Sequence, residues 1–198
     1  VRQMREGRKL VLVSDAGTPG ISDPGEWLIR ACVAAGLPVS MAPGPAAAIM
    51  AVVLSGLPTE RFCFEGFLPA ARKDRLRQLE SLAGETRTMV FYESPHRLRA
   101  VLADLLTVFG DRRCALAREL TKLHEEVERG PLSALVTKYE TREPRGEYVL
   151  VLAGAELETL RADTRADWLK MPLGEHVALY LSEGFDRMEA MKKAAKDR

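Results

Sequence analysis

The chain has 198 residues, of which 46% are hydrophobic and 29% are charged, as in an ordinary globular protein of one or two domains. Its formal net charge is only +1, so a nucleic-acid partner would have to meet a local basic patch. No apolar run reaches the ~20 residues that cross a bilayer, and no signal-peptide pattern opens the sequence. Widely spaced cysteines argue against disulfides or a cysteine zinc site and favour a reducing cytoplasm: Cys32, Cys63 and Cys114.

The first 58 residues follow the order strand, loop, helix twice. Residues 1–7 are typical of a helix end with a glycine cap, and because no earlier element precedes them we expect the sequence to be a fragment. The apolar residues 10–14 predict a strand that is buried on both faces. A glycine- and proline-rich loop over 15–25 then leads to a helix over 26–35, which Asp23 is expected to cap.

Residues 39–42 predict a second strand, which is followed by a proline–glycine–proline turn and an alanine-rich helix over 46–54. The segment 55–58, Ser-Gly-Leu-Pro, ends that helix. Two strand–loop–helix units in succession are typical of a parallel sheet whose ligand loops follow the carboxyl ends of the strands.

A second α/β domain with a mixed sheet is predicted after Pro58. Two of its strands follow each other with no helix between them, so part of the sheet should be antiparallel. The predicted strands are 61–65, 88–92, 114–118, 125–128 and 148–152, and the predicted helices are 73–82, 95–109 and 132–139.

The last part of the chain is polar, and short amphipathic helices fit residues 157–169, 175–181 and 188–195. A helix-turn-helix element and a surface bundle both fit this pattern, and we favour the bundle. The predicted domains are therefore 1–58, 59–155 and a helical extension over 156–198.

Two loops of small residues are the first candidates for a binding site. The loop over 15–25 is longer than a strand–helix connection usually needs, and small residues let a ligand approach the backbone. It is neither a Walker A nor a G-x-G-x-x-G motif. A second such loop, residues 43–48, should lie at the same edge of the sheet, so the two loops could form the walls of a pocket. The alternatives are a tight connection for the first loop and helix–sheet packing for the second.

Polar side chains gather at the ends of two later strands, in residues 91–97 and 117–125. Each group taken singly could be a solvated strand end. The sequence His124-Glu125-Glu126-Val127-Glu128 lacks the second histidine of a zincin, and no other histidine has spaced ligand partners, so we expect no metal. The absence of a G-x-S-x-G elbow argues against a common hydrolase.

These motifs, taken together and in this order, resemble the ribosomal RNA small subunit methyltransferase I family of the tetrapyrrole-methylase superfamily. The resemblance rests on eight segments between residues 14 and 148: Ser14–Pro19, Ile21–Gly25, Pro43–Pro45, Ser55–Pro58, Phe64–Pro69, Tyr92–Arg97, Arg118–Lys122 and Gly146–Tyr148. It implies a two-domain α/β fold of the tetrapyrrole-methylase type, here with a partial parallel-sheet first domain, a mixed-sheet second domain and a helical tail.

The resemblance also implies an activity and a cofactor. Members of the family use S-adenosylmethionine (SAM), bound between the domains, to methylate a cytidine ribose 2′-hydroxyl in 16S rRNA of the 30S subunit, and they act as cytoplasmic homodimers. The family's first strand and its glycine-bearing loop are missing here, so we expect this chain to bind SAM weakly or not at all. By position, the expected cofactor contacts are Asp15, Ala16, Gly17, Thr18, Ile21, Ala46, Ala47, Glu93 and Leu120.

A ribose hydroxyl is a poor nucleophile at neutral pH, so a base or a cation should assist it. A lysine with a lowered pKa could accept the proton, or an arginine could stabilise the alkoxide, and four residues remain open for these roles: Glu93, Arg97, Glu119 and Lys122. We expect RNA phosphates to contact one predicted helix, at Arg72, Lys73, Arg75 and Arg77. The alternative is that these charges form a solvent-exposed helix face with no partner. Two other functions also stay open, a methylase of tetrapyrrole-type small molecules and a non-catalytic binding module.

Overall fold

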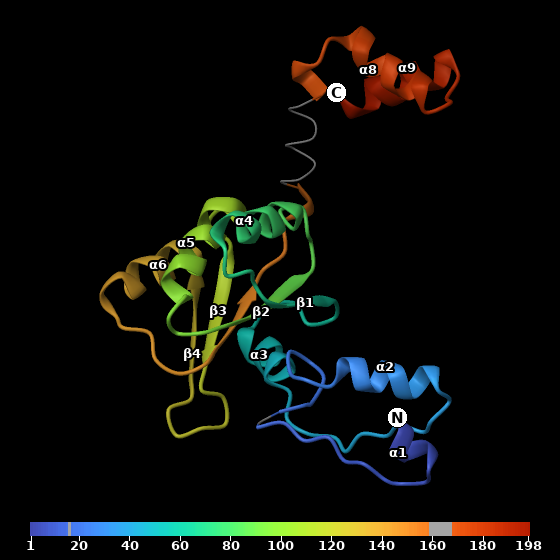
Figure 1. Ribbon diagram of the computed structural model, residues 1–198. Coiled ribbons are helices and arrows are strands. Elements are labelled where there is room, and N and C mark those ends of the chain that lie inside the picture. Colours follow the sequence, from blue (N-terminus) through green and yellow to red (C-terminus); the bar gives the residue numbers. More distant parts are fainter. Residues whose placement is uncertain (16, 159–167) are drawn as a thin grey trace. The chain divides into compact units, whose positions relative to one another are not determined.

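The computed structural model describes residues 1–15, 17–158 and 168–198 (Figure 1). The chain divides into two compact units, which are described separately. The first contains residues 1–83 and 87–153, and the second contains residues 84–86 and 154–198. In the part of the chain that the structure describes, no helix has both the length and the apolar character needed to span a membrane.

The first unit is built on a five-stranded mixed sheet with the strand order β1-β2-β5-β3-β4. β1 runs parallel to β2, while β5 is antiparallel to both β2 and β3, and β4 is antiparallel to β3. The prediction of a partly antiparallel sheet is therefore confirmed. The carboxyl ends of β1, β2 and β3 meet at one edge of the sheet, beside the amino ends of β5 and β4. The strands are β1 Phe62–Phe67, β2 Thr88–Glu93, β3 Arg113–Arg118, β4 Glu126–Pro131 and β5 Tyr148–Leu152.

Helices cover both faces of this sheet, α4, α5 and α6 on one side and α3 on the other (Figure 1). Successive strand residues point to opposite faces, so Met89 and Phe91 join the core beneath α5, whereas Val90 joins the core beneath α3. This double cover explains why β2 and β5 are almost continuously apolar. The helix bounds are α3 Ala47–Ser55, α4 Arg72–Ser81, α5 Leu98–Phe109 and α6 Leu132–Thr141.

The predicted elements between residues 46 and 152 are confirmed to within a few residues. α3 ends at Gly56, which adopts a left-handed conformation with φ of 72° that suits glycine. α5 begins at Leu98 and not at residue 95, because residues 94–97 form a turn with Arg97 at the N-cap.

The first 45 residues differ from the prediction. α1 (Arg2–Arg5) and α2 (Glu26–Ala34) form, but neither predicted strand does, and residues 1–15 and 17–61 contain no β-strand. Val11 is 88% exposed. An apolar run becomes a strand only by pairing its backbone with a neighbour, and 10–14 and 39–42 take part in no ladder among the described residues. The predicted Asp23 cap is also wrong, because Gly25 is the N-cap of α2 and no side chain bonds there.

In the second unit, α8 (Leu173–Ser182) and α9 (Arg187–Asp197) form a helical hairpin, which confirms the last two predicted helices. His176 is fully buried and stacks on Trp168 with ring centroids 4.0 Å apart. Asp186 caps α9 by accepting a hydrogen bond from the amide of Glu189 at 2.8 Å. The predicted helix over 157–169 lies mostly outside the described residues.

Candidate functional site

The two loops of small residues contact each other, as the sequence predicts. The Thr18 hydroxyl donates a hydrogen bond to the Pro45 carbonyl at 3.2 Å. Gly17 has φ of +76°, and a Cβ added there would lie 3.7 Å from the same carbonyl oxygen. A Cβ added at Gly44 would in turn lie 3.9 Å from the Gly17 carbonyl oxygen. The loops therefore meet even though the strands that should precede them are not formed.

Tyr92 joins the second loop to the sheet, and the sequence reasoning missed it as a site residue. Its hydroxyl accepts a hydrogen bond from the amide of Ala48, in the first turn of α3, at 3.2 Å. The ring packs edge-on against Phe64 and Phe67, with centroids 4.9 Å and 5.6 Å away. Burial raises the pKa of Tyr92 against the lowering effect of the Ala48 amide, and the negative charge of Asp23 raises it further. Asp23 belongs to the first loop, so Tyr92 faces both loops.

Most of the predicted cofactor contacts lie on this face of the sheet or in its loops. Ala47 and Leu120 pack against the same core as Tyr92, and Ala46 is the N-cap of α3. Asp15 and Ile21 are exposed in the first loop, whereas Ala16 lies outside the described residues.

Glu93 turns the other way, toward the core beneath α5, because it alternates with Tyr92 along β2. Its carboxylate accepts a hydrogen bond from the amide of Ser94 at 2.8 Å and lies 3.3 Å from Arg97 Nη2. Arg97 Nη2 also donates to the carbonyls of Leu68 and Pro69 at 2.8 Å and 3.1 Å. Arg97 Nε is buried without a hydrogen-bond partner among the described residues. The Glu93–Arg97 pair therefore ties the end of β1 to α5 and leaves one arginine donor unused.

Glu119 and Lys122 form a second charged group with Glu147. Lys122 Nζ lies 3.1 Å from Glu119 Oε1 and 2.8 Å from Glu147 Oε2, and Glu119 Oε1 also accepts from the amide of Glu147 at 2.9 Å. The Glu147 amide and the Lys122 ammonium lower the pKa of Glu119. Hydrogen bonds to Glu147 and Glu119 raise the pKa of Lys122. The direction of this shift favours Lys122 as a cation over the alternative of a lysine with a lowered pKa.

Both charged groups lie at the same edge of the sheet. Glu93 and Arg118 are the register partners of Tyr148 on either side, and Arg118 is in turn the partner of Glu126. Arg118 also pairs with Glu126 at 3.2 Å. The structure thus brings together the two polar strand ends that the sequence singled out, at the edge where the carboxyl ends of β1, β2 and β3 gather.

The predicted RNA-contact helix, α4, needs one correction. Arg75 is 5% exposed, and its guanidinium contacts Asp104 Oδ2 at 2.8 Å and the carbonyls of Pro69 and Ala70. It is a structural residue and is not available to RNA. The other three basic residues, Arg72, Lys73 and Arg77, are exposed. Arg72 forms an ion pair with Asp104, and Arg77 forms one with Asp74.

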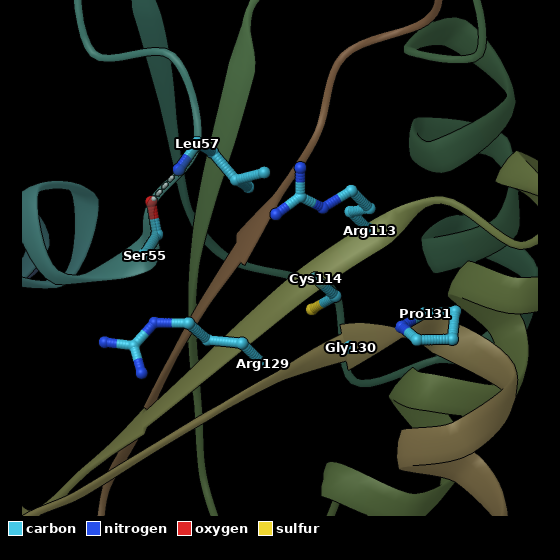
Figure 2. A pocket seen from close by; sticks show the side chains of 7 residues that line it. All are labelled: Ser55, Leu57, Arg113, Cys114, Arg129, Gly130 and Pro131. Atoms are coloured by element: carbon cyan, nitrogen blue, oxygen red, sulfur yellow. Dashed lines mark hydrogen bonds between the residues drawn. The ribbon is translucent and has the colours of Figure 1, made fainter.

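A cavity of about 320 Å³ opens at the opposite edge of the sheet (Figure 2). Arg129 Nε donates to the Leu54 carbonyl at 2.9 Å and so caps the end of α3. Burial raises the pKa of the Cys114 thiol to about 12, which leaves it inert. None of the predicted site residues lies among those that line the cavity: Ser55, Leu57, Arg113, Cys114, Arg129, Gly130 and Pro131.

Solved structures share this fold. The methyltransferase CobJ matches 78% of this chain and 68% of its own length with a TM-score of 0.58 and 23% identity. The cobalt precorrin-4 methyltransferase CbiF matches 77% of this chain and 66% of its own length with a TM-score of 0.56 and 17% identity. At these identities the likeness extends to the fold alone, which confirms the predicted fold class.

Sequence relatives show the family. The profile of the family described as Tetrapyrrole (Corrin/Porphyrin) Methylases matches residues 1–136. A protein of Synechocystis sp. named Ribosomal RNA small subunit methyltransferase I is 42% identical over 98% of this chain and 68% of its own length. The protein of the same name from Xylella fastidiosa is 45% identical over 98% of this chain and 70% of its own length. The chain therefore belongs to the tetrapyrrole (corrin/porphyrin) methylase family, in the branch of ribosomal RNA small subunit methyltransferase I.

Proposed function

We propose that this protein transfers a methyl group from SAM to the 2′-hydroxyl of a cytidine ribose in 16S rRNA of the small ribosomal subunit. The relatives named above support the rRNA substrate. The observation that carries the proposal is the meeting of two small-residue loops above Tyr92, marked by the Thr18–Pro45 and Ala48–Tyr92 hydrogen bonds.

The residues of this site fit a SAM molecule. Gly17 holds a left-handed backbone conformation with no side chain in the way, so a ligand can reach main-chain groups there. Ala46 and Ala47 lie where α3 begins, and their small side chains leave room for a ligand near the start of the helix. When bound, the cofactor supplies a methyl group already activated on a sulfonium sulfur. The proposed contacts are Asp15, Ala16, Gly17, Thr18, Ile21, Ala46, Ala47 and Leu120, with Glu93 through its backbone.

The charged edge of the sheet would serve the acceptor ribose. Lys122 Nζ, whose pKa is raised by Glu147 and Glu119, would stabilise negative charge that develops on the ribose oxygen while the hydroxyl proton passes to solvent water. The partly exposed guanidinium of Arg97, which is paired with Glu93, offers a second positive group. Glu93 would act indirectly, because its buried carboxylate fixes the position of Arg97.

The proposal includes an RNA contact at the exposed Lys73 and Arg77 of α4, a homodimer, and a cytoplasmic location, where ribosomal subunits are found. Charge reversal at Lys73 and Arg77 together should weaken 30S binding and flatten its salt dependence while SAM affinity stays constant. If the salt dependence of 30S binding has the same slope in the variant and the wild type, the basic residues of α4 form a solvent-exposed face and do not contact RNA.

A methyl-transfer assay tests the function. Small subunits from a strain that lacks the corresponding gene are incubated with the protein and SAM labelled in the methyl group. Primer extension then locates the modified nucleotide. We expect label in 16S rRNA, at one cytidine. Label only in a precorrin-type substrate would favour the small-molecule alternative, and SAM binding with no methyl acceptor would favour a non-catalytic module.

A further inference from the structure

Positive charge in the second unit is concentrated on α9. The segment 173–186, which contains α8, carries Glu175, Glu183 and Asp186 and no lysine or arginine. In contrast, the segment 187–198 has five basic residues and two acidic ones. The basic residues are Arg187, Lys192, Lys193, Lys196 and Arg198, and the acidic ones are Glu189 and Asp197.

Contacts inside the hairpin already engage some of these charges. Asp197 accepts a hydrogen bond from the Tyr180 hydroxyl and lies 3.5 Å from His176 Nε2. Glu189 is in the first turn, where a negative charge favours the helix dipole. Lys193 Nζ lies 4.2 Å above the Phe185 ring, which is a cation–π contact.

Two lysines on the outer face of α9 lie outside these contacts. Lys192 and Lys196 are exposed and form no ion pair within the described ranges of the chain. They are one helical turn apart, and like charges at this spacing destabilise a helix by about 0.2–0.5 kcal/mol. Glu189, one turn before Lys192, forms an ion pair with neither lysine within the described residues. The observed pair suits a partner that brings negative charge.

Exposed apolar side chains flank these lysines. Met188 is 64% exposed and Met191 is 51% exposed, while the inward-facing Ala190 and Ala194 are fully buried. With α-helical spacing of 100° per residue, Met188, Lys192, Ala195 and Lys196 share the side of α9 opposite these buried alanines, and Met191 lies at its margin. The exposed Glu189 is the acidic residue on this same side. The surface therefore combines positive charge with flexible apolar groups.

We propose that this face of α9 binds the sugar–phosphate backbone of RNA, with Lys192 and Lys196 on phosphates and Met188 and Met191 against sugars or unpaired bases. The inference rests on the proposed rRNA substrate and adds a contact surface in the second unit. A-form RNA has a major groove that is too narrow for side chains to read, so the contacts should be insensitive to sequence. An anionic membrane is the weaker partner, because two methionines offer little of the large apolar surface that interfacial helices insert.

The test uses the whole chain and two RNA probes, purified 30S subunits and a short labelled single-stranded RNA. The variant is Lys192→Glu with Lys196→Glu. The matched control is Arg8→Glu with Lys9→Glu, which changes net charge equally at exposed residues of the first unit. Circular dichroism and thermal melting check that each variant keeps its fold. Vesicles of phosphatidylserine and phosphatidylcholine serve as a third probe.

We expect the α9 variant to bind both RNAs at least tenfold more weakly than the control variant. The slope of log K against log salt for the single strand should become shallower by about 1.4, because two phosphate contacts are lost at ~0.7 each. Binding of the α9 variant equal to that of the control would overturn this inference alone. Loss of vesicle binding with RNA binding intact would assign the face to lipid and would also overturn it. Wild-type protein that binds neither RNA would overturn the proposed rRNA substrate as well.

Discussion

Gly17 shows how one residue can decide whether the cofactor loop is usable. Its φ of +76° is costly for any residue with a Cβ, by about 1–2 kcal/mol, and a side chain would point toward the Pro45 carbonyl. In a protein with the full length of its relatives, such as the Synechocystis protein, of which this chain covers 68%, we expect Gly17→Val to lower SAM affinity at least tenfold, which is roughly 1.4 kcal/mol, as measured by calorimetry. Gly110→Val is the control, since Gly110 also has positive φ and has open space around it. Unaltered SAM binding by Gly17→Val would refute this placement of the cofactor.

Tyr92 offers a gentler test of the same site. Tyr92→Phe keeps the ring packing against Phe64 and Phe67 and removes only the hydroxyl that accepts from the Ala48 amide. The lost intramolecular hydrogen bond should lower the free energy of unfolding by about 1 kcal/mol. Because this bond positions the second loop, we also expect SAM affinity to fall about fivefold. Tyr148→Phe is matched chemically, because its hydroxyl accepts from the Arg145 amide on the other face of the sheet. An equal loss of SAM affinity in both variants would contradict a specific role for Tyr92.

For single residues, the sequence predicts which side chains belong to the candidate site, but it does not predict which groups surround each of them. The polar strand ends were found from sequence, and they do meet at one edge. However, the direction of Glu93 depends on the strand alternation set by Phe91 and Val90. The charge state of Lys122 depends on Glu147, which lies 25 residues away. Tyr92 could have been found as the residue that alternates with Glu93 and so faces the opposite side of the sheet.

Between α4 and α5, the Arg75–Asp104 pair is a structural connection. Both side chains are almost fully buried, at 6% and 3% exposure, and removal of Arg75 leaves the buried Asp104 carboxylate with only the exposed Arg72 as its ion-pair partner. Arg75→Met should therefore lower the free energy of unfolding by about 3–5 kcal/mol, measured by urea denaturation. Arg72→Met removes an ion pair to the same carboxylate from an exposed position and should cost less than about 1 kcal/mol. Similar losses for the two variants would contradict the distinction.

The connection between β3 and β4 should make stability depend on pH. The folded pKa of Glu119 is lowered, so its contribution is complete above the unfolded value of about 4.3 and is lost as pH falls through the folded value. The folded pKa of Lys122 is raised, so its contribution is complete below about 10.4 and is lost as pH rises through the folded value. The stability difference between wild type and Glu119→Gln, measured by urea denaturation across pH, should be constant near neutrality and shrink in acid. The exposed Glu143→Gln is the control, and a pH-independent difference for Glu119→Gln would refute the assignment.

Elements were predictable where local pattern and tertiary partners agree. β2 and β5 are covered on both faces, so their apolar runs were interpreted correctly. Residues 10–14 have the same pattern and form no strand, because strand formation also requires a paired neighbour. In α4, charge alone could not show that Arg75 turns inward to Asp104, a residue of another helix.

At the level of the whole molecule, the order of secondary structure from residue 46 onward followed from sequence, while the grouping into units needed the contacts. Residues 1–83 and 87–153 form one compact unit, whereas a boundary near residues 58–61 was predicted, and that boundary stays a prediction. α3 explains the difference, because it belongs to the first predicted domain and packs on the sheet of the second. The relatives named ribosomal RNA small subunit methyltransferase I confirm the family that the ordered motifs indicated.

The proposed homodimer leads to a prediction for the molecule as a whole. The first unit exposes many large apolar side chains, among them Val11 at 88%, Val13 at 78% and Trp27 at 72%. An extended apolar segment without a ladder can pair with a second copy of itself. We therefore expect the protein to form dimers in sedimentation equilibrium, and Val11→Lys with Val13→Lys to shift it toward monomer.

The control is Leu123→Lys, at a residue that is 93% exposed in the β3–β4 connection. It removes a comparably exposed apolar side chain without touching the segment 10–13, so it should leave the dimer intact. If the dimer persists in the double-lysine variant, the interface lies elsewhere. If wild type is monomeric at every concentration tested, the homodimer itself is refuted. Dissociation by the segment variant alone would show that the apolar residues before the first cofactor loop hold two copies together, and SAM titration of that monomer would then show whether the site needs the second copy.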